Sequence, residues 1–75
     1  MNMANARNPD KAKIAGELET MKSLELSARD LYTQIANDPR VDPEKIRNAF
    51  AKLAEDEHRH AGLVQEIIRL LDAAS

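Results

Sequence analysis

The stretch LAEDEHRHA, residues 53–61, is central to the fold of this chain. It places charged side chains at positions where the helical spacing otherwise puts apolar ones. It contains two overlapping Glu-x-x-His pairs, Glu55/His58 and Glu57/His60. Residues three apart lie on the same face of a helix, so either pair can present a carboxylate and an imidazole together.

The phase of the surrounding apolar residues distinguishes the two pairs. Those residues alternate at spacings of four and three: Ile46, Phe50, Leu53, Val64, Ile67 and Leu71. Continued through the gap, the alternation lands on Glu57 and His60, whereas Glu55 and His58 point away from it. A carboxylate on an apolar stripe is costly unless something compensates its charge. The sequence therefore predicts a compensating group beside Glu57, and a solvated face for Glu55 and His58.

Length and composition exclude several classes of protein. A chain of 75 residues makes one small domain with a small core. It has no cysteine, which excludes disulfides and cysteine-ligated zinc or iron–sulfur sites. The net charge of -2 gives no basic surface for nucleic acid, and no apolar run is long enough to span a membrane. We expect a cytoplasmic helical protein with neither nucleic acid nor membrane as a partner.

The chain in order predicts an N-terminal segment and a first helix. Residues 1–8 are polar and without periodicity, which predicts disorder. Asn8, Pro9 and Asp10 form a helix start, with asparagine as the N-cap and proline at the first helical position. The helix expected over about residues 9–37 carries its own stripe at spacings of four and three: Ile14, Leu18, Met21, Glu25, Ala28, Tyr32 and Ile35.

A second helix follows after a short connection. The sequence Asn37-Asp38-Pro39 ends the first helix, since the residue before a proline disfavours helical geometry. Asp42-Pro43-Glu44 repeats the start signal, and the second helix is expected over about residues 43–73. A connection of this length makes the helices antiparallel neighbours. Residues 9–75 are therefore predicted to form an all-α helical hairpin.

Glu25 is a second charged residue on an apolar stripe. Counted from the connection, Glu25 on the first helix and Glu57 and His60 on the second come level within about one helical turn. No lysine or arginine occupies a stripe position, so protein cations are not the obvious compensators. The three polar residues are expected to gather at mid-height and to face the same interior.

A second copy of the chain solves the problem of the remaining apolar surface. Two helices cannot enclose a core, so a lone hairpin leaves a patch that marks an interface. We expect a homodimer in which two hairpins form a four-helix bundle and duplicate Glu25, Glu57 and His60. Four carboxylates would repel one another, whereas two divalent cations would make the site neutral. Di-iron and di-manganese bundle proteins are built on this ligand set.

Two motifs resemble the signatures of a known family. Residues 25–32, ELSARDLY, resemble the Glu-x-x-Ala-Arg-x-x-Tyr signature of rubrerythrin-like proteins, and residues 57–61, EHRHA, resemble their Glu-x-x-His-Ala signature. The resemblance covers roughly residues 14–71, which is half of that family's four-helix, ferritin-like domain. In architecture the chain is similar to encapsulated ferritins, whose two-helix protomers rebuild the domain by association.

The resemblance implies a role for each residue of the site. Glu25 and Glu57 would be terminal or bridging metal ligands, and His60 a terminal nitrogen ligand. Asp56 would accept a hydrogen bond from the other ring nitrogen of a His60; a solvated carboxylate is the alternative. Tyr32 would reach a ligand carboxylate or bound oxygen; as a lone tyrosine on the stripe it is otherwise a core residue.

Ligand hardness and the resemblance together indicate the activity. Oxygen-rich ligands with one imidazole per ion suit iron or manganese, at two ions per dimer. The leading hypothesis is oxidation of Fe(II), a ferroxidase activity, or reduction of O2 or peroxide. Because the chain has no cysteine-ligated iron to donate electrons, repeated reduction of peroxide would need a separate reductant. Iron storage would require a larger assembly, a compartment or a shell protein. The alternative is a non-enzymatic hairpin that dimerises or binds a partner.

Overall fold

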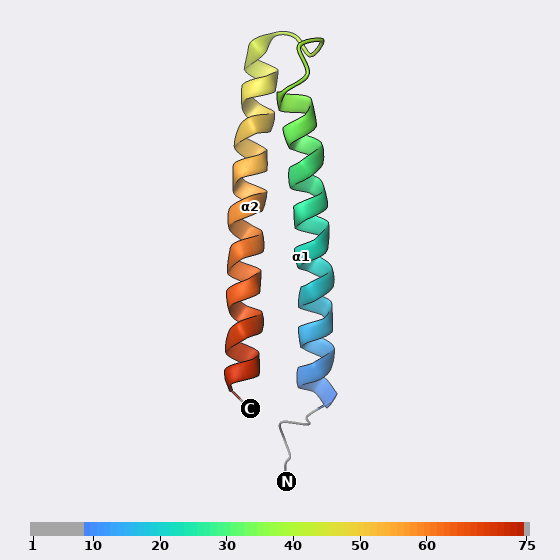
Figure 1. The fold of residues 1–75 in the computed structure, drawn as a ribbon, viewed down its shortest axis with the longest axis vertical. Coiled ribbons are helices and arrows are strands. Elements are labelled where there is room, and N and C mark those ends of the chain that lie inside the picture. Colours follow the sequence, from blue (N-terminus) through green and yellow to red (C-terminus); the bar gives the residue numbers. More distant parts are fainter. Residues whose placement is uncertain (1–8, 75) are drawn as a thin grey trace.

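Two antiparallel helices form the whole of the described structure. The computed structural model describes residues 9–74, in which α1 (Pro9–Ala36) and α2 (Glu44–Ala73) lie side by side and no strand occurs (Figure 1). The prediction of an all-α hairpin is confirmed. The segment 1–8 and the N-cap proposed at Asn8 lie outside the described residues. Within residues 9–74, neither helix is long and apolar enough to cross a membrane.

The helix ends differ slightly from the sequence expectation. α1 ends one residue before the expected position and α2 begins one residue after it. Pro43 is the N-cap of α2, so the prediction that Pro43 would be the first helical residue was wrong. Its side chain makes no capping bond. The reason is that the Pro43 carbonyl already accepts the first bond of the helix, from the Ile46 amide at 2.9 Å.

The connection between the helices is held by its own polar groups. The Val41 amide donates to the Asp38 carbonyl at 3.1 Å, which closes a turn with Pro39 at its second position. The Asp38 carboxylate accepts bonds from the Arg40 amide at 2.9 Å and from the Arg40 guanidinium at 2.7 Å. Arg47 of α2 donates to the Val41 carbonyl, which ties the connection to the second helix.

Asp38 gives the connection a measurable pH dependence. Hydrogen bonds from the Arg40 side chain and amide lower the pKa of Asp38 from 3.8 to about 2. Because this pKa is lower in the folded chain, the contact stabilises the fold above about pH 4, and its contribution is lost as the pH falls toward 2. We expect Arg40→Ala to return the Asp38 titration midpoint toward 3.8, measured by carbon NMR of the carboxyl group. Arg69→Ala, a change far along α2, should leave the midpoint alone; a midpoint near 3.8 in the unsubstituted chain would contradict the prediction.

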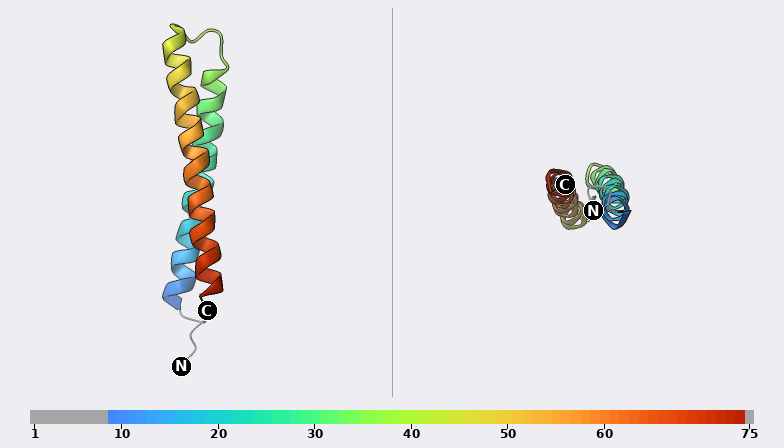
Figure 2. Two further views of the ribbon diagram at one scale, coloured as in Figure 1. Left: turned by 90° about the vertical axis from the view of Figure 1, so that its left-hand side faces the viewer. Right: turned by 90° about the horizontal axis from the view of Figure 1, so that it is seen from below.

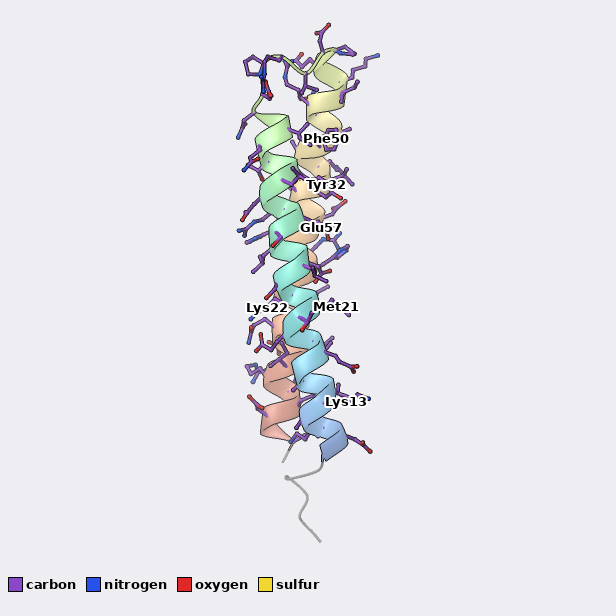
Figure 3. All side chains as sticks on the ribbon, turned by 90° about the vertical axis from the view of Figure 1, so that its right-hand side faces the viewer. Lys13, Met21, Lys22, Tyr32, Phe50 and Glu57 are labelled. Carbon is purple, nitrogen blue, oxygen red and sulfur yellow. The ribbon has the colours of Figure 1, made fainter. Side chains whose placement is uncertain are left out.

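Small and apolar side chains on two neighbouring rows of α2 pack against α1. Among the described residues, the buried side chains are Ala54, Ala61 and Ile68 on one row and Val64 on the next, and we call them together the seam. Toward the connection, the seam ends in a tilted contact between Tyr32 and Phe50, whose ring centroids lie 5.8 Å apart (Figure 3). Alanines let the two helices approach closely, because their side chains fill little space between the backbones.

The opposite edge of each apolar stripe remains uncovered. The hairpin is one layer thick, as the end view shows (Figure 2). Within the described part of the chain, the exposed large apolar side chains fall on two heptad rows of each helix. Together we call them the open face: Ile14, Met21, Leu24, Leu31, Ile46, Leu53, Leu63, Ile67 and Leu70. Exposed apolar side chains gathered in this way are typical of an interaction site.

Candidate metal centre

The three polar residues of the stripes meet near mid-height, where seam and open face adjoin. Glu25 comes from α1, and Glu57 and His60 come from α2. Each offers one ligand atom, and these atoms all lie within 4.8 Å of one another. His60 Nδ1 is 3.4 Å from Glu57 Oε1 and 3.7 Å from Glu25 Oε2. Two donors on ~2.1 Å bonds at right angles to one ion lie about 3 Å apart, so the group is close to a coordinating arrangement.

The site is partly enclosed on the hairpin side. The Glu25 side chain is 19% exposed and that of Glu57 24%, whereas His60 is 46% exposed because it lies on the open face. Along the hairpin, Glu57 lies between the aromatic pair Tyr32/Phe50 and the level of Met21 (Figure 3). The two carboxylates are thus more enclosed than the imidazole.

Glu25 carries an oxygen that the fold itself leaves unsatisfied. Its Oε1 atom is buried and, within the described part of the chain, has no hydrogen-bond partner. A buried carboxylate oxygen without a partner costs free energy that folding does not return. A divalent cation between the three side chains would satisfy this oxygen, and two carboxylates with one neutral imidazole are suitable ligands for such an ion.

Protein cations near the site are engaged elsewhere. Lys22 donates to Gln65 and pairs with Glu19 at 3.1 Å. Arg29, one turn from Glu25, pairs with Asp30 at 2.9 Å and contacts the His58 ring at 3.1 Å. Both cations therefore bond to groups other than the three candidate ligands. The Arg29 contact with His58 was missed, because the sequence does not indicate which helix edges meet outside the stripes.

The two residues expected to support the site have other partners in the structure. Asp56 pairs with Arg59 at 3.2 Å, and within one chain no hydrogen bond joins it to His60. Tyr32 packs against Phe50 as a seam residue. The supporting roles of Asp56 and Tyr32 stay predictions.

Three donors from one side do not complete the shell of a divalent iron or manganese ion, which takes up to six ligands in octahedral geometry. The open side of the group is the side on which His60 and the exposed apolar rows lie. The three side chains therefore leave coordination positions of such an ion open on that side.

An antiparallel helix pair with a carboxylate on one helix and a Glu-x-x-His pair on the other is half of the ligand arrangement found in ferritin-like, di-iron helix bundles. The sequence model of the Rubrerythrin family matches residues 17–74, a range that includes all three candidate ligands. The chain therefore belongs to the rubrerythrin family, within the ferritin-like superfamily. Rubrerythrin-type domains typically bind iron. No curated protein and no solved structure matched the chain.

Proposed function

We propose that two copies of this chain hold two iron ions between them and use the site to oxidise Fe(II) or to reduce O2 or peroxide. The ligands would be Glu25, Glu57 and His60 from each copy. The observation that carries the proposal is the buried, partnerless Oε1 of Glu25 beside a second carboxylate and an imidazole. Manganese is the alternative metal.

Charge balance supports two ions in such a dimer. Four carboxylates carry a charge of about -4, and two divalent cations compensate it while both imidazoles remain neutral. Without the ions, four like charges would be held in one interior, which is strongly unfavourable. The metal would therefore stabilise the dimer as well as equip it for chemistry.

The residues of the chain would each contribute to the chemistry in a stated way. A bound pair of iron ions supplies two electrons, one from each ion, to an oxygen species. Glu25 and Glu57 would hold the negative charge that compensates the ions. Water would be kept away by apolar residues farther along the seam, Val64 and the Tyr32/Phe50 pair. Tyr32 is two turns from Glu25 on the same row, and helical side chains lean toward the N-terminus, so we place its hydroxyl beside the ligands.

Iron analysis and oxygen uptake test the proposal. Protein loaded anaerobically with Fe(II) and freed of excess metal should carry about one iron per chain, as two ions in a two-chain site require. Exposure to air should then consume oxygen at a rate well above that of Fe(II) in buffer. His60→Ala should lose both, whereas His58→Ala, an exposed histidine two residues away, should lose neither. Iron far below one per chain under these conditions would contradict the proposal.

The open face supports a second candidate function, a hairpin that only dimerises or binds a protein partner. Its apolar rows would suffice for that role, and the three polar residues would then form a structural network. The two candidates differ in the metal experiment, because a binding module would associate equally well with or without iron.

A further inference from the structure

Two cations of α1 lie within about one helical turn of Glu25. Lys22 precedes Glu25 by three residues and Arg29 follows it by four, and residues with these spacings are neighbours on a helix. Helical side chains lean toward the N-terminus, which carries the Glu25 carboxylate over the turn that contains Lys22. An ammonium group at this place could satisfy the buried Oε1 of Glu25, which has no partner in the described part of the chain. The structure instead holds both cations on other groups.

Arg29 is fixed mainly by its own neighbour on α1. Its Nε and Nη2 atoms both donate to the Asp30 carboxylate, at 3.1 and 2.9 Å, and its Nη1 atom lies 3.1 Å from Nδ1 of the His58 ring. Because two of these three contacts are made within α1, the position of the Arg29 guanidinium does not depend on a single residue of α2.

Lys22 depends on α2 to a greater extent. Its ammonium donates to the side-chain oxygen of Gln65 and pairs with Glu19 at 3.1 Å. The Glu19 side chain is 53% exposed, and an ion pair with an exposed carboxylate contributes little. Glu19 alone would therefore hold the ammonium weakly, and the bond to Gln65 is the contact that draws it across to the second helix.

Lys22 and Gln65 meet on the side of the hairpin away from the open face. Each lies two residues, about 200° of helix rotation, from an open-face leucine: Leu24 on α1 and Leu63 on α2. Lys22 and Met21 lie at one level of α1 and extend to different sides of it (Figure 3). A substitution at Gln65 therefore leaves the apolar rows of the open face unchanged.

We propose that Gln65 is a positioning residue: it holds the Lys22 ammonium away from Glu25, so that the Glu25 carboxylate stays free for a metal ion. The inference rests on the proposed function, in which Glu25 is a ligand. The Lys22 side chain is only 24% exposed, so its ammonium needs protein acceptors in place of water. Without the Gln65 oxygen, the unsatisfied oxygen of Glu25 is the acceptor that remains within one turn, and the ammonium would compete there with the metal.

A titration with Mn(II) tests the inference. Gln65→Met removes the acceptor oxygen and keeps a side chain of similar length and helix propensity. If the pair between Lys22 and Glu25 is then favoured about tenfold, as for a charge-assisted hydrogen bond, the apparent affinity for Mn(II) falls by about the same factor. The affinity is measured from the electron paramagnetic resonance signal of the free ion. Gln34→Met, the same change at an exposed position of α1, should leave the affinity unaltered.

A second substitution separates positioning from packing. Lys22→Met in the Gln65→Met chain should restore the affinity for Mn(II), because it removes the competing cation, whereas alone it should change the affinity only slightly. Gln65→Glu retains an acceptor for Lys22 and should bind Mn(II) at least as tightly as the unsubstituted chain. Equal affinities of the Gln65→Met and unsubstituted chains, or a loss that Lys22→Met does not restore, would overturn the inference.

Unfolding of the metal-free protein by urea tests the same contact without any metal. A double-mutant cycle of Lys22→Met and Glu25→Met, at one protein concentration, measures the coupling between the two side chains. The coupling should be near zero with Gln65 in place and should reach about tenfold in the unfolding equilibrium constant in the Gln65→Met chain. Equal coupling in both chains would overturn the inference. The expected increase in a protein that binds no Mn(II) would overturn the proposed function alone.

Discussion

Replacing Glu57 with alanine is expected to abolish iron binding and, with it, all metal-dependent stabilisation. A metal present at 100 times its dissociation constant stabilises a fold by about 2.7 kcal/mol. In a domain of this size that corresponds to a rise of roughly 10–20 °C in the midpoint of thermal unfolding. In the metal-free protein Glu57→Ala should instead raise the midpoint of thermal unfolding, because alanine removes a largely buried carboxylate that lies 3.4 Å from the His60 imidazole.

The midpoints of thermal unfolding are measured by circular dichroism at one protein concentration, with and without metal. The metal content of the same samples is determined in parallel. Glu55→Ala is the matched control, since Glu55 lies two residues away on the same helix and is exposed. It should change neither the metal content nor either midpoint beyond a small amount. If Glu57→Ala kept its iron, the carboxylate would not be a ligand and the proposed site would be wrong.

The fold was predictable because two independent signals agree. Prolines and asparagine or aspartate break the chain between residues 37 and 43, and apolar spacings of four and three run on each side of the break. The candidate site was predictable for the same reason. Glu25, Glu57 and His60 interrupt that spacing at matching heights, and the structure brings their ligand atoms within 4.8 Å.

The side of each stripe that meets the other helix was not predictable. Phe50 and Leu53 belong to the same apolar stripe, yet Phe50 packs in the seam and Leu53 lies on the open face. The buried residues Ala54 and Ala61 lie outside the stripe altogether. In a bundle, one helix contacts two neighbouring helices through two sides of its apolar stripe. The spacing of apolar residues marks the whole stripe and does not show which side contacts which neighbour. Alanine is also too weakly apolar to mark the side of closest approach.

The contacts of charged side chains were equally hidden from the sequence. Arg29 could have paired with Glu25 one turn away, but it pairs with Asp30 and contacts His58. That choice depends on which edge of α1 faces α2, and this rotation is set by packing. Glu25 consequently keeps an oxygen without a partner. The sequence does not reveal this oxygen, and it is the feature that makes the motif a specific candidate site.

Replacing Leu53 with lysine is expected to dissociate the proposed dimer. In an isolated hairpin the change should be nearly neutral, since Leu53 is exposed there. In the dimer it would bury two ammonium groups, one per chain, against apolar side chains. A loss of at least about 2 kcal/mol per chain weakens association roughly 1,000-fold. Sedimentation should show the mass fall from about twice the 8.4 kDa of one chain to that value.

The matched control is Ala51→Lys, which adds the same charge two residues away on an exposed position outside the open face. It should leave the dimer intact and fully able to bind iron. Leu53→Lys should also lose its iron, although it retains all three ligands of its own chain, because each metal ion would keep only half of its shell. A Leu53→Lys monomer that still bound one iron per chain would show that a single hairpin suffices. Loss of iron together with the dimer would instead support a centre shared between two copies.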